Sequence, residues 1–87
     1  MGLGGVYVAT YGKKAIPLDN YRLRIVFDNA EERVFDVAPY IQGTWYGQLK
    51  DKAYFNRVTT DGFTVVWPDG QDIYPDELYS FSYEANA

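Results

Sequence analysis

Apolar and polar residues alternate most regularly over Tyr21–Phe27. The odd-numbered positions of this segment are aromatic or aliphatic, and two of its three even-numbered positions are Arg22 and Arg24. A period of two predicts a half-buried β-strand with the arginines on its exposed face. Val6–Tyr11 is also rich in β-forming residues and predicts a further strand, while Leu18–Asn20 is typical of a turn.

A return strand, Arg33–Val37, is predicted after the polar turn Asp28–Glu31. A plain two-residue turn would set a carboxylate, Asp36, on the apolar face. A bulged turn shifts the pairing by one residue and sets Leu23 opposite Val37, so we expect the bulged register. Such a bulge needs a residue with positive φ at or near the third position of the loop.

Asp61-Gly62 is the strongest turn signal of the chain. This dipeptide is typical of a two-residue type I′ hairpin, because both residues tolerate positive φ. The turn would pair Val58 with Val65 and bury both beside Trp67. Trp67–Gly70 then predicts a further turn.

Capping signals predict three short helical segments. Pro39 and Pro75 suit first helical positions, and Asp51 suits an N-cap. The predicted segments are Ala38–Gln42, Asp51–Asn56 and Pro75–Ser80. With about five strands, they indicate an α+β fold on a small, mainly antiparallel sheet. We expect a single domain over residues 1–87, with frayed ends at 1–5 and 84–87.

Composition narrows the possible functions. The 87 residues include no Cys and no His, which removes thiol nucleophiles, disulfides, the usual general base and the commonest metal ligand. We therefore expect no catalytic residues, no metal and no cofactor. The net charge of −4 disfavours nucleic acid as a partner. Without a membrane-spanning stretch or a signal-peptide pattern, we expect a cytoplasmic protein with no membrane partner.

Aromatic residues supply the first candidate binding residues: Trp45, Tyr46 and Trp67. Aromatic residues make up 18% of the chain, and Tyr and Trp are favoured both in interfaces and in small cores. Trp45-Tyr46 lies in a loop between two glycines and could be an exposed anchor. Because a small domain spares few Trp for solvent, we expect this pair to fold back on the core instead.

Charged residues supply the remaining candidates. Asp69 and Asp72, with the acidic pair at 76–77, could bind a hard cation through carboxylate oxygens. Turns and helix N-termini also favour carboxylates at these positions, and we expect that structural role. Arg22 and Arg24 either bind an acidic partner or keep an exposed sheet face from unwanted pairing.

Three stretches of the chain are similar to a known family: DNYRLRIVFDNAEERVFDVAPY, LKDKAYFNRV and VVWPDGQDIYPDELY. Over Leu18–Tyr79 the chain resembles the uncharacterised bacterial family catalogued as domain of unknown function 2442. The most specific part is the W-P-x-G-x-D-I-x-P-D-x-L run at Trp67–Leu78. Ala30 departs from the family pattern, which has Gly after Phe-Asp-Asn.

The resemblance implies a small α+β fold and no established reaction. Some relatives are encoded beside a small toxin-like protein, which implies an antitoxin or partner-binding role. Others carry an added helix-turn-helix domain, for which we find no counterpart after Tyr83. We therefore expect a non-enzymatic protein-interaction module, antitoxin-like toward a small basic protein. A small-molecule binding domain with an aromatic pocket, or an oligomeric module built on a sheet edge, is the alternative.

Overall fold

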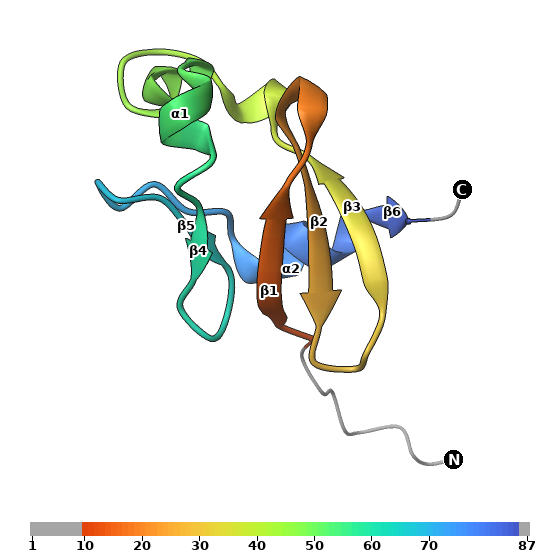
Figure 1. Cartoon of the computed structure of the whole chain (residues 1–87). Coiled ribbons are helices and arrows are strands. Elements are labelled where there is room, and N and C mark those ends of the chain that lie inside the picture. The colour runs from red at the N-terminus through yellow and green to blue at the C-terminus, as the bar shows by residue number, and fades with distance from the viewer. Residues whose placement is uncertain (1–9, 86–87) are drawn as a thin grey trace, which may run out of the picture.

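The computed structural model describes residues 10–85, which form two antiparallel sheets, two short α-helices and three 3₁₀ turns (Figure 1). The strands are β1 (Gly12–Pro17), β2 (Arg22–Phe27), β3 (Glu32–Asp36), β4 (Thr59–Thr60), β5 (Val65–Val66) and β6 (Tyr83–Glu84). The helices are α1 (Lys52–Phe55) and α2 (Pro75–Ser80), and the 3₁₀ turns cover Asp19–Tyr21, Ala38–Tyr40 and Tyr46–Lys50. The predicted α+β class is confirmed.

The larger sheet has the order β1-β2-β3-β6, and β4 and β5 form a separate hairpin beside β1. Thr60 donates its hydroxyl to the carbonyl of Lys13 at 3.1 Å, and the N–H of Gly12 donates to the carbonyl of Phe63 at 3.3 Å. These bonds use part of the β1 edge, which would otherwise offer unpaired backbone groups to other chains.

β1 replaces the strand that was predicted near the N-terminus. The strand expected at Val6–Tyr11 is not found at Thr10 and Tyr11, and its residues 6–9 lie outside the described part of the chain. The strand observed instead pairs Ala15 with Ile25 and Ile16 with Arg24. Its lysines and proline obscure the alternation, but such residues are common on edge strands.

β2 begins one residue later than predicted. Asn20 and Tyr21 have φ of 63° and 59°, so the chain is still turning at Tyr21. Positive φ is unusual for a bulky residue. Here the phenol of Tyr21 donates to the carbonyl of Lys50 at 2.6 Å, and its ring meets that of Phe55 edge-on at 5.4 Å. These tertiary contacts hold the strained residue in place.

The β2–β3 register differs from both registers considered from sequence. Leu23 lies opposite Phe35, two residues from the expected partner Val37. A shift of two keeps every side chain on its predicted face, so the apolar faces still match. The loop itself is confirmed as bulged: Ala30 has φ of 73°, and its N–H donates to the carbonyl of Phe27 at 2.9 Å.

The two-residue turn at Asp61-Gly62 is wrong. Thr60 pairs with Val65, which leaves a four-residue loop. The carboxylate of Asp61 accepts the N–H groups of Phe63 and Thr64 at 2.9 and 3.0 Å, and these bonds lower the pKa of Asp61. An aspartate that captures two backbone donors stabilises the wider loop over the type I′ turn. Val58 and Val65 are both buried, as expected, but they are not partners.

The helix signals are confirmed, and the C-terminal prediction is not. Asp51 caps α1 by accepting the N–H of Ala53 at 3.0 Å, and α2 spans the predicted residues. β6 pairs with β3 and includes Glu84, which lies in the range 84–87 expected to fray. Residues 1–5 and 86–87, also expected to fray, lie outside the described residues.

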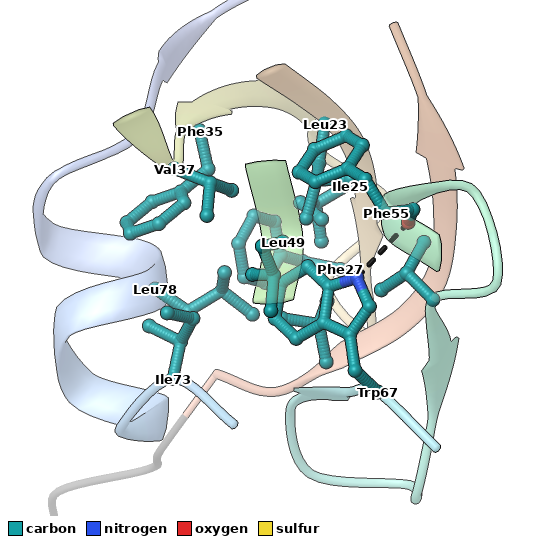
Figure 2. Close-up of a cluster of buried hydrophobic side chains, with 12 residues drawn as sticks. Leu23, Ile25, Phe27, Phe35, Val37, Leu49, Phe55, Trp67, Ile73 and Leu78 are labelled. Carbon is teal, nitrogen blue, oxygen red and sulfur yellow. Dashed lines mark hydrogen bonds between the residues drawn. The ribbon is translucent and has the colours of Figure 1, made fainter. Parts of the chain in front are cut away.

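The core lies between one face of the larger sheet and the helices and hairpin behind it (Figure 2). Leu23, Ile25 and Phe27 supply the β2 side of this core. Trp67 lies near its centre at 2% exposure, and its indole N–H donates to the carbonyl of Phe55 at 2.9 Å. That bond satisfies the one polar group of the buried ring.

Candidate functional site

An open groove of about 330 Å³ lies where β3 ends. Its walls come from the end of β3, from the following 3₁₀ turn and from the residue after α2. The lining residues are Phe35, Asp36, Pro39, Tyr40 and Phe81. Phe81 is 66% exposed, although it is one of the largest apolar side chains of the domain. We call this feature the β3 groove.

Local chemistry shapes one wall of the β3 groove. The carboxylate of Asp36 accepts the N–H of Ala38 at 3.1 Å, and Pro39 occupies an early position of the 3₁₀ turn. Asp36 therefore has a structural role in this turn. The turn brings the ring of Tyr40 to 5.6 Å from that of Phe35, so aromatic surface faces the groove.

A hydrogen bond ties this wall to α2. The phenol of Tyr40 donates to the carboxylate of Glu77 at 2.8 Å. Burial, together with the hydrogen bond to this carboxylate, raises the pKa of Tyr40 to about 12. Tyr40 therefore stays protonated at neutral pH and remains the donor of this hydrogen bond.

The charges at the β3 groove have one sign. Asp36 is exposed at its rim, Glu77 lies behind Tyr40, and no Lys or Arg is among its lining residues. An apolar surface bordered by carboxylates is complementary to an apolar side chain with a cationic neighbour.

A second, smaller hollow of about 240 Å³ is polar. It is lined by Glu31, Glu32, Arg33, Glu84 and Ala85. The guanidinium of Arg33 donates to the hydroxyl and carbonyl of Ser82 at 2.6 and 2.7 Å. Because that cation already holds β3 to the C-terminal segment, the hollow offers less contact chemistry than the β3 groove.

Trp67 was a candidate binding residue, and the structure places it in the core. At 2% exposure it cannot present its ring to a partner. Trp45 shows the opposite outcome. It is 49% exposed, so the expectation that it folds back on the core is wrong. Its ring lies over Gly70, 3.9 Å from where a Cβ would stand.

The structure brings Trp45 and Tyr46 to the turn that carries Asp69 and Asp72. Tyr46 donates its phenol to the carbonyl of Asp72 at 2.8 Å, and burial, followed by the Asp72 charge, raises the pKa of Tyr46. The N–H of Asp69 donates to the phenol oxygen of Tyr54 at 3.0 Å. These bonds use backbone groups, and both carboxylates remain exposed.

The acidic run does not assemble a cation site in the structure. Within residues 10–85, no three His, Cys, Asp or Glu side chains converge as metal ligands would. Asp76 and Glu77 stand in the first turn of α2, where carboxylates complement the backbone N–H groups.

Arg22 and Arg24 lie on the sheet face that points away from the core. Arg24 forms an ion pair with Glu32 at 3.1 Å, and the Nε of Arg22 donates to the carbonyl of Asp19 at 3.2 Å. The positive charge of this arginine pair is therefore partly neutralised by an acidic residue of the neighbouring strand.

Sequence reasoning missed most of the β3 groove. Phe81 was not among the candidate residues, and Tyr40 was placed only within the short helical segment Ala38–Gln42. The available signal was Phe81 itself. A large apolar residue directly after a helix, in a small domain, indicates either a core position or a binding surface. Only the pairing of β6 with β3 brings Phe81 beside Phe35.

The chain was compared with known protein families. A family model described as protein of unknown function (DUF2442) matches residues 13–84. The chain belongs to this family. The match is wider than the stretch recognised from sequence and includes every residue of the β3 groove, so the DUF2442 region and the described fold nearly coincide. No curated protein and no solved structure matches the chain.

The helices are also informative about membranes. In the part of the chain that the structure describes, none is long and apolar enough to cross a bilayer.

Proposed function

We propose that this DUF2442 chain is a non-enzymatic protein-interaction module that binds a small basic protein through the β3 groove. One observation carries the proposal: exposed aromatic surface and two carboxylates meet in a groove with no cationic lining residue. Aromatic side chains dominate binding energy at protein interfaces, and charge complementarity selects the partner.

The size and openness of the groove support a protein partner. A volume of about 330 Å³ accepts a large side chain, and the groove opens to solvent beside Phe81. An apolar residue of the partner would contact Phe81 and Tyr40, while a neighbouring Lys or Arg would approach Asp36. The net charge of −4 would also speed the approach of a basic protein.

The roles of the two carboxylates favour binding over catalysis. Asp36 accepts a backbone N–H, and Glu77 accepts the phenol of Tyr40. The phenol that Glu77 accepts has a pKa raised to about 12, so Tyr40 holds its proton at neutral pH and serves as a hydrogen-bond donor.

In its specific form, the proposal makes the chain the antitoxin-like partner of a small toxin-like protein. The support is the family pattern noted from sequence, in which some relatives are encoded beside such a protein. The chain would then act by covering the active surface of its partner.

The test begins with capture of interacting proteins by the tagged chain in lysate of its host at low salt. The captured protein is then purified, and its affinity for variants of the chain is measured. We expect a small basic protein whose binding weakens at least tenfold, roughly, with Phe81→Ala. Phe63→Ala is the matched control, because Phe63 is also exposed, at 55%, but lies in the β4–β5 loop. We expect it to change the affinity by less than about twofold.

A second variant tests the charge. Asp36→Asn keeps an oxygen for the N–H of Ala38 while it removes the negative charge, so we expect weaker binding that depends less on salt. Equal effects of Phe81→Ala and Phe63→Ala would refute the groove as the site. A small molecule that remains bound to the purified chain and is lost with Phe81→Ala would show that the groove binds a small ligand instead of a protein.

A further inference from the structure

One face of the larger sheet is not covered by any helix or hairpin among residues 10–85. Both helices and the β4–β5 hairpin supply residues to the core on the other face. Figure 1 shows the sheet from its open side, with α2 behind the strands. We call this surface the open face.

A row of four residues crosses the open face, one from each strand. The pairing sets Ile16 beside Arg24, Arg24 beside Val34, and Val34 beside Tyr83. The ends of the row are exposed, with Ile16 at 38% and Tyr83 at 41%, whereas Val34 is only 5% exposed. Val26, in the next row, adds to the apolar surface.

The charges on the open face are divided between its two halves. Lys14, Arg22 and Arg24 lie on the β1–β2 half, and Glu32 and Asp36 lie on the β3 half. Arg24 and Glu32 pair within the chain at 3.1 Å. In the described residues, Arg22 and Asp36 form no ion pair, although their backbones are partners across the two strands.

This layout is complementary to itself under one rotation. A two-fold axis parallel to the strands, between β2 and β3, sets each basic half against the acidic half of a second copy. The same axis sets Ile16 against Tyr83 of the second copy, and Arg22 against Asp36 of the second copy. A two-fold axis across the strands would instead set basic against basic, so the charges favour a single arrangement.

We infer that the open face binds a second copy of this chain, sheet against sheet, with the two copies related by the axis along the strands. Aligned packing of two sheets about 10 Å apart is common in β-sandwiches. This inference does not rest on the proposed function, because the β3 groove lies at the end of β3 and not in the cross-strand row.

The expected dimer is weak. Four strands about 4.8 Å apart and three rows of side chains span roughly 20 by 20 Å, so each copy covers on the order of 400 Å². The total area buried on both copies lies below the roughly 1,200 Å² of standard interfaces, and we expect a dissociation constant on the order of 100 µM.

Sedimentation equilibrium from about 10 µM to 1 mM tests the inference. We expect the unmodified chain to change from the mass of one copy to that of two over this range. Ile16→Glu places a charge opposite Tyr83 of the second copy and should raise the dissociation constant at least tenfold. Phe63→Glu, the matched exposed control outside the open face, should leave it unchanged. A single-copy mass at 1 mM, or equal effects of the two variants, would overturn the inference.

A charge exchange tests the orientation. Arg22→Asp and Asp36→Arg should each weaken the dimer at least fivefold, and the double variant should restore the affinity. Arg57→Asp, on the exposed segment after α1, is the control for a change of net charge. Thermal unfolding of each variant confirms that it is folded. Failure of the double variant to recover, with all variants folded, would exclude this axis.

The double variant also separates the two proposals. It removes the Asp36 carboxylate from the β3 groove, so it should lose affinity for a basic protein while it recovers the dimer. Phe81→Ala should show the reverse: weak partner binding and a normal dimer.

Discussion

The turns Phe27–Glu31 and Trp67–Gln71 have the same backbone hydrogen bonds but different surroundings. In each, the first residue donates its N–H to the fifth and accepts the N–H of the fourth, all at 2.9 Å. The fourth residue has positive φ in both, 73° for Ala30 and 104° for Gly70. This is the three-residue loop with a bulge at its last position.

The fifth residue is where the two turns diverge. Glu31 is exposed at the tip of the β2–β3 hairpin, and accepts the phenol of Tyr79 at 2.6 Å. Gln71 is fully buried: its side chain accepts the phenol of Tyr54 at 2.9 Å and donates to the carbonyl of Trp45 at 3.0 Å. The same backbone turn is thus a local structure at one end of the domain and a tertiary junction at the other.

The largest expected effect comes from removal of that junction. Gln71→Ala removes the acceptor of the Tyr54 phenol and the shorter of two hydrogen bonds to the Trp45 carbonyl, and it opens a cavity. We expect a loss of about 3 kcal/mol in the free energy of unfolding. The equivalent change in the other turn, Glu31→Ala, should cost much less, because its site is exposed. Urea unfolding measures both, and similar losses would show that the two turns are held alike.

The next largest effect is expected from a change in the backbone of the Trp67–Gln71 turn. Gly70→Ala should lower the free energy of unfolding by about 1–2 kcal/mol, because φ of 104° lies outside the left-handed region that alanine tolerates. The added methyl would come no closer than 3.9 Å to the Trp45 ring, so a clash does not contribute. No loss in urea unfolding would mean that the turn relaxes toward the geometry of Ala30.

The reverse substitution in the first turn should stabilise. Ala30→Gly relieves about 1 kcal/mol of left-handed strain, and the added freedom of the unfolded chain offsets part of it. We expect a gain of about 0.5 kcal/mol, read from the urea midpoint with an unchanged slope. A less stable variant would contradict strain at Ala30.

The smallest expected effect is a dependence of stability on pH, which arises in the Phe27–Glu31 turn and not in the Trp67–Gln71 turn. The hydrogen bond from Tyr79 is the main cause that lowers the pKa of Glu31 below its ordinary 4.5. A lowered carboxyl pKa contributes stability that is present above pH 4.5 and is lost as pH falls through the folded value. Gln71 does not titrate.

Glu31→Gln isolates this contribution, because glutamine retains an oxygen that can accept the Tyr79 phenol. We expect the unmodified chain to lose more stability than the variant between pH 7 and pH 3. Parallel losses would show that the Glu31 charge adds nothing to the turn.

Much of the local structure could be predicted from sequence because short-range physics decides it. The alternation in β2, the Asp51 cap and the proline that starts α2 each act within a few residues. The positive φ predicted at or near the third loop position is found at Ala30, even though the register used to argue it is two residues off. The alternation of faces survives such a shift, and a bulged loop of this length needs a left-handed residue.

The candidate site was harder to predict. Asp36 could be placed in its turn, because its bond to the N–H of Ala38 spans two residues. Phe81 and Tyr40 could not be placed beside it, because β6 has only two paired residues and little sequence pattern. The burial of Trp67 could be predicted because it extends the strand pattern of Val65, whereas Trp45, in a loop between two glycines, was expected to fold back and is 49% exposed.

The sequence alone determined the fold class, the helix starts, the faces of β2 and β3 and the absence of thiol and imidazole chemistry. These follow from residue periodicity, capping and composition, which need no distant contact. Only the tertiary structure decided the strand registers, the position of β6 and the exposure of Trp45. Each depends on contacts between residues far apart in the chain, whose free energies exceed the local preferences that compete with them.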